Sequence, residues 1–504
     1  MSRPGPPTVL VANRGEIARR VLRTLRRLGV RTIAVHSDPD AQAPFVGDAD
    51  VAVSLDGVSP AETYLDVEKI LGIGRAHGAT MVHPGYGFLS ENAAFARAVE
   101  AEGWAFIGPT PTSIEAMGDK TRALVEAKAA GVPTIPSYIP PLGKTPSNEE
   151  LIQRALEVGL PLMVKAAAGG GGKGMRIAHH EKEIPELVAA ASREALNAFG
   201  DGRLFLERYL ENARHVEVQL LGDGNGNAIA VGERDCSIQR RHQKLVEESP
   251  APALPDQTRA AMHASAVALA ERVSYRGAGT VEFILAPTGE FFFLEMNTRL
   301  QVEHPVSELV HGIDLVEAQL RIAEGSCNLA SFGDLTPRGH AIELRVYAED
   351  PANDFLPSIG ILDTVFWSDD PGIRVDSGVV TGQSVTINYD PMLAKLIAYG
   401  ATRDEAIDRL RTAIAGSFIA GVETTLSFGR DLIGREDFRK ADIFTTFIAD
   451  RMSPWSPPVI EEDWNETIVA ATRHVLAKAS RRGGGAGSPP PTPSETLPGW
   501  RHLG

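Results

Sequence analysis

The pattern of apolar and polar positions changes along the chain and predicts structural units of different kinds. Residues 8–12 are mostly apolar, and apolar residues then recur at helical spacing between Ile17 and Leu28. Short apolar runs follow near residues 80–82 and 105–107. This alternation of strands and helices predicts a doubly wound α/β domain over residues 1–118.

The first predicted helix carries a strongly basic polar face. We expect this face to meet solvent or another subunit rather than to bind an anion. Its arginines are Arg19, Arg20, Arg23, Arg26 and Arg27.

Hairpins mix with helices further along the chain, which predicts an α+β domain over residues 119–334 with a flap at about 136–206. Alternating strands and a following helix predict a third domain over residues 335–451. The remaining residues, 452–504, predict one amphipathic helix near 461–480 and a tail rich in glycine and proline. We expect that helix to dock a partner chain.

Composition limits the location and the partners. The 504 residues are 43% hydrophobic and 23% charged, which is an ordinary balance for a globular protein. A net charge of −15 argues against binding to nucleic acid or to an anionic membrane, and the sequence lacks an apolar run long enough to span a membrane. We expect a cytoplasmic protein in which Cys236 and Cys327 are buried rather than disulfide-bonded or zinc-bound.

A glycine-rich loop lies early in the α+β domain. Residues 162–165 predict a strand that leads into the loop, and residues 174–178 predict a strand that returns from it. The glycine spacing fits a dinucleotide fingerprint, but a strand follows where that fold requires a helix, and the Walker A pattern also fails. We interpret the loop as a flap whose backbone amides approach phosphates, with Lys165 and Lys173 at its ends. A plain flexible hairpin is the alternative.

Two carboxylates mark the most informative segment, a predicted hairpin at residues 279–297. A four-residue turn would place Glu282 opposite Phe293, so that Glu295 lies diagonally across the same face at about 7–8 Å. Like charges so placed repel unless a cation joins them, and Asn297 adds a further oxygen ligand on that face. The sequence therefore predicts a Mg²⁺ or Mn²⁺ site at these three polar residues. A solvated face is the alternative.

Two polar runs accompany this hairpin. One spans Arg234–Lys244, and the other follows the hairpin directly at Arg299–Pro305. Such a density of polar groups beside apolar strands is typical of a functional site, although a charged surface strand is the alternative for the first run. In the third domain Arg345 lies on the polar face of an alternating strand, and this pattern by itself favours a structural role.

Taken together, these segments closely resemble the biotin carboxylase family within the ATP-grasp group. The resemblance extends from residue 8 to about residue 450 and implies an N-terminal pre-ATP-grasp domain, an ATP-grasp domain with a glycine-rich flap and a C-terminal biotin carboxylase domain. The stretches that carry it are residues 12–18 (Ala-Asn-Arg-Gly-Glu-Ile-Ala), 83–92 (His-Pro-Gly-Tyr-Gly-Phe-Leu-Ser-Glu-Asn), 117–120, the flap, 234–244, 295–305 and 390–392.

The resemblance implies an ATP-dependent ligase that forms a C–N bond. ATP would phosphorylate bicarbonate to carboxyphosphate, and the CO₂ released from it would carboxylate N1′ of biotin. The implied cofactors are ATP, Mg²⁺ or Mn²⁺, and biotin. Metal ions at Glu282, Glu295 and Asn297 would neutralise charge on the transferred phosphoryl group.

The resemblance also implies roles for individual side chains. Glu303 would be the general base for bicarbonate, and Arg345 would bind biotin and stabilise its enolate. The implied catalytic residues are Lys244, Arg299, Glu303 and Arg345, and the implied bicarbonate ligands are Lys244, Arg299, Gln301 and Val302. The implied ATP-binding residues are Lys120, Lys165, Gly171, Gly172, Glu207, Arg208, Tyr209, Leu210, His215, Gln239 and His242.

The family resemblance finally implies partners. Carrier proteins present biotin on a lysine between two methionines, and no lysine of this sequence is so flanked, so we expect biotin on a partner chain or a missing domain. We expect a biotin carboxyl carrier protein and a carboxyltransferase as partners in an acetyl- or propionyl-CoA carboxylase, and a homo-oligomer or a hetero-oligomeric assembly. Arg27 stands where bacterial dimers of the family often have an acidic residue. Two alternatives are another ATP-grasp ligase, of the carbamoyl-phosphate or carboxylate–amine type, and a non-catalytic nucleotide-binding subunit.

Overall fold

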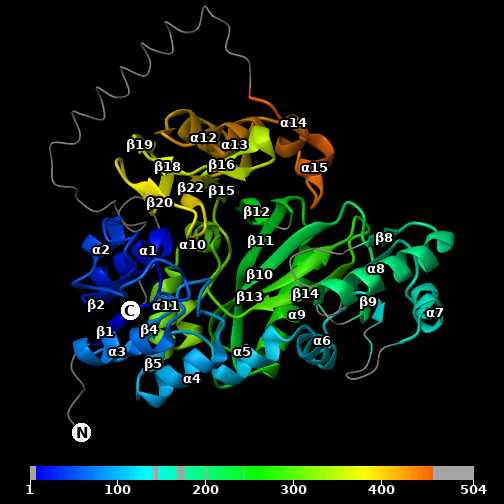
Figure 1. Ribbon diagram of the computed structural model, residues 1–504, viewed down its shortest axis with the longest axis horizontal. Helices are drawn as coiled ribbons and strands as arrows, with labels where there is room; N and C mark the ends of the chain where they lie inside the picture. The colour runs from blue at the N-terminus through cyan, green and yellow to red at the C-terminus, as the bar shows by residue number, and fades with distance from the viewer. Residues whose placement is uncertain are drawn as a thin grey trace, which may run out of the picture.

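The computed structural model describes residues 7–138, 140, 146–166, 176–199, 202–241 and 243–457. Gly171 and Gly172 of the predicted flap, His242 and the predicted helix near 461–480 lie outside these residues. In Figure 1 the N-terminal unit (blue) lies beside a central unit (cyan and green), and the C-terminal unit (yellow to orange) lies above both.

The N-terminal unit is the α/β domain that the sequence predicts. Its five strands have the order β3-β2-β1-β4-β5, and every neighbouring pair is parallel. A parallel sheet is covered on both faces, and accordingly Val9, Leu10 and Val11 in the central strand are fully buried. The strands are β1 (Thr8–Val11), β2 (Arg31–His36), β3 (Val51–Ser54), β4 (Met81–His83) and β5 (Ala105–Phe106). The helices are α1 (Gly15–Arg27), α2 (Pro44–Asp48), α3 (Val67–His77), α4 (Ala93–Ala101) and α5 (Pro111–Gly118).

A small antiparallel sheet in the central unit carries the strands on either side of the glycine-rich loop. Its order is β6-β9-β7-β8, and two helices enclose an apolar core with it. The loop joins β7 to β8, which confirms that strands and not a helix flank it. The elements are α6 (Lys120–Ala129), β6 (Ser137–Tyr138), α7 (Asn148–Val158), β7 (Leu162–Ala166), β8 (Arg176–Ala178), η1 (Glu181–Glu183), α8 (Ile184–Phe199) and β9 (Leu204–Arg208).

An eight-stranded antiparallel sheet joins the central and C-terminal units. Its order is β14-β13-β10-β11-β12-β15-β22-β20, so the last three strands extend the sheet beyond residue 334. The central strands are β10 (Arg214–Asp223), β11 (Ala228–Arg240), β12 (Gln243–Ser249), β13 (Arg276–Leu285) and β14 (Phe291–Asn297), with helices α9 (Asp256–Arg272), α10 (His304–His311) and α11 (Leu315–Ala323). The C-terminal strands of this sheet are β15 (His340–Tyr347), β20 (Ile373–Ser377) and β22 (Met392–Gly400).

Short strands and helices complete the C-terminal unit. The helices α12 (Arg403–Ala415) and α13 (Leu426–Ile433) contribute apolar residues to a core with β15 and β22. The other elements are η2 (Leu329–Phe332), β16 (Glu349–Asp350), η3 (Pro351–Asn353), β17 (Leu356–Pro357), β18 (Gly360–Ile361), β19 (Thr364–Phe366), β21 (Ser384–Val385), β23 (Phe418–Ala420), α14 (Glu436–Arg439) and α15 (Phe447–Arg451). No helix in the part of the chain that is described is both long and apolar enough to cross a membrane.

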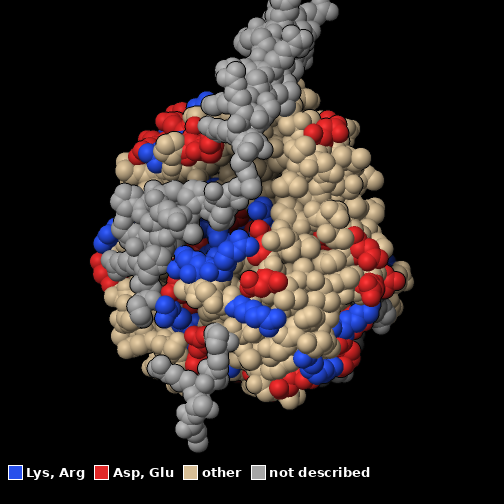
Figure 2. Space-filling model, turned by 90° about the vertical axis from the view of Figure 1, so that its left-hand side faces the viewer, with Lys and Arg blue, Asp and Glu red and all other residues tan. Residues whose placement is uncertain are grey.

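The basic face of α1 corrects an expectation from the sequence. Arg20 is buried, with only 3% of its surface exposed, and its guanidinium lies 2.6 Å from Glu308 and 2.9 Å from Asp314. Arg23 is half-buried and lies 3.0 Å from Asp376 of β20. On the side of the molecule that carries α1 and α2, Figure 2 shows basic side chains beside acidic ones. Most of this face therefore binds the other two units, because their acidic residues neutralise it.

Candidate active site

The hairpin of β13 and β14 brings the two predicted metal-binding carboxylates together, in a register that differs from the prediction. Its loop runs from Ala286 to Glu290, one residue longer than predicted, and places Phe283 opposite Phe293. A bulge at Leu294 then places Glu282 directly opposite Glu295. The predicted pairing of Glu282 with Phe293 is therefore wrong. Direct opposition brings the two Cβ atoms to about 4.5–5.5 Å, closer than the predicted diagonal.

The two carboxylates have different surroundings. Glu282 is buried and lies 2.9 Å from Lys244 Nζ and 2.9 Å from His215 Nε2. Burial alone would raise the pKa of Glu282, but these two cations outweigh it and lower the pKa well below its usual value. Burial and the charge of Glu282 raise the pKa of the half-buried Glu295. Among the described residues no hydrogen bond to the Glu295 carboxylate is found, so this carboxylate is the one that a further cation would stabilise.

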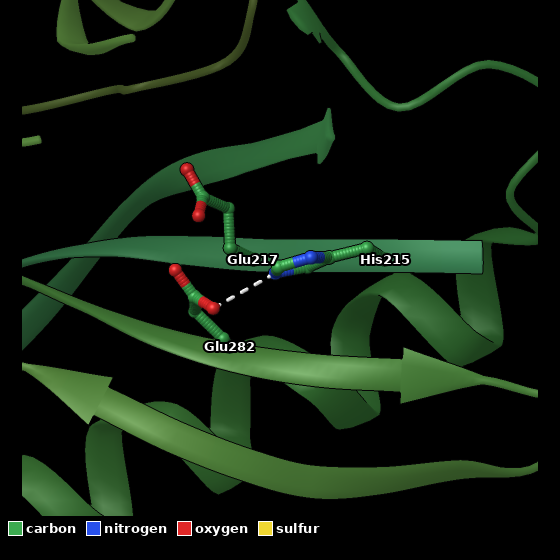
Figure 3. A group of neighbouring side chains, drawn as sticks. All are labelled: His215, Glu217 and Glu282. Carbon is green, nitrogen blue, oxygen red and sulfur yellow. Dashed lines mark ion pairs between the residues drawn. The ribbon is translucent and has the colours of Figure 1, made fainter. Parts of the chain in front are cut away.

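Lys244 lies at the centre of the site. Its Nζ is 2.7 Å from Glu217 of β10, 2.9 Å from Glu282 of β13 and 2.6 Å from Glu303, the residue before α10. Burial disfavours the charged ammonium, but the three carboxylates outweigh this effect and raise the pKa of Lys244 well above its usual value. Figure 3 shows how Glu217 and Glu282 approach each other from neighbouring strands.

Glu303 connects Lys244 to Arg345. The carboxylate is fully buried and accepts a hydrogen bond of 3.0 Å from Arg345 Nη2 in addition to the one from Lys244. Arg345 Nε in turn donates to Glu247 at 2.6 Å. Burial would raise the pKa of Glu303, but Lys244, Arg345 and Arg234 outweigh it and hold the pKa well below its usual value.

The predicted bicarbonate ligands lie next to this line of charges. Arg299 Nη1 donates to Gln301 at 3.0 Å, and Gln301 Nε2 lies 3.4 Å from Glu282, the carboxylate that also binds Lys244. Val302 immediately precedes Glu303. Arg299 Nε donates to Glu91 at 2.9 Å, and the backbone amide of Thr298 donates to the same carboxylate at 3.0 Å. The sequence did not single out Glu91 by itself, although it lies in the conspicuous stretch at residues 83–92.

The described residues predicted to bind ATP lie on the two sheets and on segments beside them. Lys165 of β7 forms an ion pair with Glu207 of β9 in the small sheet. In the large sheet, Gln239 pairs across a hairpin with Lys244. Lys120 begins α6, and its charge offsets part of the rise in the pKa of Glu295, which places Lys120 on the same side as the predicted metal site. Arg208 is exposed, whereas Tyr209 and Leu210 are half-buried where the chain leaves β9 toward β10.

Comparisons with known proteins agree with this arrangement. Three family models match: the biotin carboxylase N-terminal domain at residues 6–114, the ATP binding domain of the carbamoyl-phosphate synthase L chain at 119–330, and the biotin carboxylase C-terminal domain at 343–450. The biotin carboxylase of Pseudomonas aeruginosa is 45% identical over 445 residues, which cover 88% of this chain and 98% of that protein. This chain belongs to the biotin carboxylase family. The two flanking models disfavour the alternative of a different ATP-grasp ligase.

A longer relative and a solved structure extend the comparison. The human mitochondrial propionyl-CoA carboxylase alpha chain is 48% identical over 446 residues, which cover 88% of this chain but 61% of that protein. This chain therefore spans less than two thirds of that relative. The biotin carboxylase domain dimer of Hydrogenobacter thermophilus 2-oxoglutarate carboxylase, in complex with MgADP, ADP and bicarbonate, has a TM-score of 0.81 and 44% identity. The match covers 88% of this chain and 97% of that one.

Two acidic clusters near Lys244 also bring possible metal ligands close together. Ligand atoms of His215, Glu217 and Glu282 lie within 4.8 Å of one another, as do those of Glu217, Cys236 and Glu303. Both clusters contain Glu217, whose carboxylate already lies 2.7 Å from Lys244 and 2.5 Å from the buried Arg234. These cations supply the charge that a metal would bring. Glu282 is paired with cations as well, so Glu295, which lies directly opposite it, is the carboxylate that the geometry leaves for a further cation.

Replacing Lys244 by methionine should destabilise the protein in a pH-dependent way. The pKa of Glu303 is lower in the folded protein than in the unfolded chain. Its ion pairs therefore stabilise the fold at pH values above the unfolded-state pKa, and this stabilisation is lost as the pH falls through the folded-state pKa. Without Lys244 the pKa of Glu303 rises, and the free energy of unfolding drops by about 3–5 kcal/mol near pH 7 and by less near pH 4.

Thermal melts of both proteins between pH 4 and pH 8 measure this difference. Lys440→Met is the matched control, because Lys440 is exposed and pairs only with the exposed Glu436 among the described contacts. Its effect should stay within about 0.5 kcal/mol. If the destabilisation by Lys244→Met did not change with pH, the ion pair between Lys244 and Glu303 would not be its source.

Proposed function

We propose that this chain uses ATP and bicarbonate to carboxylate biotin, as the biotin carboxylase component of an acyl-CoA carboxylase. The observation that carries the proposal is the continuous line from Lys244 through Glu303 to Arg345. It joins the residue proposed to bind bicarbonate to the residue proposed to bind biotin, with the proposed base between them. A single carboxylate can therefore act where the two halves of the reaction meet.

The metal site supports the use of ATP. Glu282 and Glu295 face each other directly, and Asn297 lies two residues beyond Glu295 on β14, with its amide donating to Glu282 at 2.8 Å. Hard oxygen donors of this kind suit Mg²⁺ or Mn²⁺, which would neutralise charge on the phosphates of ATP when bound. Lys120, Lys165, Glu207 and the other residues named above would hold the nucleotide, with the flap residues Gly171 and Gly172 and with His242.

The proposed base depends on the substrates for its strength. Lys244 and Arg345 keep Glu303 ionised, so it can accept a proton but is a weak base. Bicarbonate bound at Lys244, Arg299, Gln301 and Val302 would share the positive charge of Lys244. Glu303 would then lose part of its stabilisation, its pKa would rise, and it would accept the bicarbonate proton more readily.

Arg345 would act on the biotin half of the reaction. Its guanidinium is held by Glu247, Tyr347 and Glu303, and this fixes the direction of its N–H groups. A fixed guanidinium in a buried site stabilises a developing enolate oxygen strongly, because no reorganisation is needed when the charge forms.

The partners and the compartment are also proposals. Membership of the biotin carboxylase family supports a place in a carboxylase assembly, and we propose a biotin carboxyl carrier protein and a carboxyltransferase as partners. A homo-oligomer is supported by the dimeric solved relative. In this structure Arg27 forms ion pairs with Asp314 and Glu317 of its own chain. We propose a cytoplasmic location, although one relative is mitochondrial by name.

The purified chain should hydrolyse ATP only when bicarbonate is present, and free biotin should increase the rate. Bicarbonate must accept the phosphoryl group before biotin can react, so its removal stops turnover. Phosphate release in CO₂-free buffer, with and without added bicarbonate, measures this. A rate that bicarbonate does not change rules out the proposed function.

Glu295→Gln should lower bicarbonate-dependent ATP hydrolysis by at least about a hundredfold, because charge stabilisation by the metal is the main catalytic contribution at this position. Steady-state rates over a range of Mn²⁺ concentrations check it. Glu290→Gln is the matched control, since Glu290 is exposed at the turn of the same hairpin. A near-normal rate with unchanged metal dependence in Glu295→Gln would refute the metal site.

Arg345→Ala should separate the two halves of the reaction. Carboxylation of free biotin should fall by at least about a hundredfold, whereas bicarbonate-dependent ATP hydrolysis should fall less, because Lys244 still binds Glu303. Glu303→Gln should reduce both activities together. The two rates are measured side by side by phosphate release and by fixation of labelled bicarbonate into biotin. Equal losses in Arg345→Ala would assign Arg345 a structural role.

A further inference from the structure

A buried lysine of the C-terminal unit contacts the backbone of the proposed bicarbonate site. Lys395 of β22 is fully buried, and its Nζ donates to the carbonyl oxygen of Val302 at 2.9 Å. The same Nζ lies 3.1 Å from Glu16 and 3.9 Å from Asp376. An ammonium without access to water is costly unless such partners surround it. Its position thus favours a specific task, and the task that its contacts indicate is to hold Val302.

The partner of Lys395 comes from a conspicuous stretch of the sequence that the proposed mechanism does not use. Glu16 lies in the first turn of α1, and its carboxylate accepts a hydrogen bond from the Tyr86 hydroxyl. Asn13 Nδ2 donates to the carbonyl oxygens of Pro84 and Tyr86, at 2.7 Å each. Residues 12–18 and 83–92 are therefore joined to each other, and through Glu16 they reach Lys395.

The backbone permits this close approach at one glycine. A Cβ atom at Gly378, just after β20, would lie 2.6 Å from the backbone nitrogen of Glu16. Because Gly378 has no side chain, the start of α1 can approach β20 and β22, and there the Glu16 carboxylate forms an ion pair with Lys395. The backbones of the N-terminal and C-terminal units thus lie in close contact beside the lysine.

Lys395 also lies next to the proposed biotin-binding residue. Arg345 and Lys395 are directly opposite each other on β15 and β22. Two cations on paired strands therefore hold the same short segment: Arg345 binds the side chain of Glu303, the proposed general base, and Lys395 binds the main chain of Val302.

We propose that Lys395, supported by Glu16, is a positioning residue that fixes the backbone at Val302 and thereby orients the bicarbonate-binding segment from Arg299 to Glu303. The proposal rests on the function proposed above, because it assigns a ligand to that segment. Lys395 does not touch the reacting atoms. It acts through the peptide group that links Val302 to Glu303, and it couples the bicarbonate site to the N-terminal unit.

Lys395→Met tests the proposal, since methionine fills much of the same volume but cannot donate a hydrogen bond. We expect the KM for bicarbonate to rise by at least about tenfold, which corresponds to about 1.4 kcal/mol, while the KM for ATP changes by less than about twofold. Both constants come from bicarbonate-dependent ATP hydrolysis. An unchanged KM for bicarbonate in the folded variant overturns the proposal.

Arg20→Met is the matched control. Arg20 is a buried cation on α1, the helix that carries Glu16, but it binds Glu308 and Asp314 of the central unit and has no described contact with residues 299–303. We expect it to lower the melting temperature without a selective effect on the KM for bicarbonate. If both variants changed the two KM values in the same proportion, loosening of the N-terminal unit from its neighbours would explain the result and the positioning role would be rejected.

If Lys395→Met does not fold, the double variant with Glu16→Gln and Lys395→Met tests the proposal instead. Removing both charges avoids an unpaired buried carboxylate at Glu16, and the KM for bicarbonate should remain raised because Val302 is still not held. If this variant also failed to fold, Glu16→Gln alone should raise the same KM several-fold. A wild-type value in whichever variant folds contradicts the proposal. Wild-type protein without any bicarbonate-dependent hydrolysis would instead contradict the proposed function.

Discussion

The ammonium of Lys244 is the interaction on which the geometry of the site depends. Three carboxylates from β10, β13 and the start of α10 lie 2.6–2.9 Å from one nitrogen atom. Carboxylates so close together in a buried site would separate or become protonated without a cation between them. Lys244 thus fixes the spacing of the strands relative to the helix. Dipoles and charges fixed in this way need no rearrangement when a phosphoryl or carboxyl group carries new negative charge.

The eight-stranded sheet extends from the central unit into the C-terminal unit and connects Lys244 to Arg345. Strand β12 pairs with β15 from Val246 to Ser249, so the strand that bears Lys244 is a direct neighbour of the strand that bears Arg345. A hinge between the central and C-terminal units at residue 334 would have to break that pairing. Lys244 and Arg345, which both contact Glu303, are therefore held on one sheet.

Alternation along the strands predicted which face the functional carboxylates share, but not how they pair. Glu282 and Glu295 share a face as expected, but only because the bulge at Leu294 offsets the extra loop residue; without the bulge, Leu294 would lie opposite Glu282. The bulge at Leu294 could not be foreseen, since it depends on how the hairpin packs. Arg20 was misassigned for a related reason: its partners Glu308 and Asp314 lie far along the chain, and local periodicity contains no signal for them. The resemblance to a family supplied candidate site residues that spacing alone left open.

Lys395 could not be singled out from the sequence for the same reason, because its partners lie far from it along the chain. It lies in a strand of apolar neighbours, where a single lysine usually reaches solvent with its ammonium group. Here the ammonium meets Glu16 and the carbonyl of Val302, and each of these contacts joins a different unit to β22. A buried charge is tolerated only where the fold brings its partners to it. The need to satisfy Lys395 therefore ties the N-terminal unit and the segment that precedes Glu303 to β22.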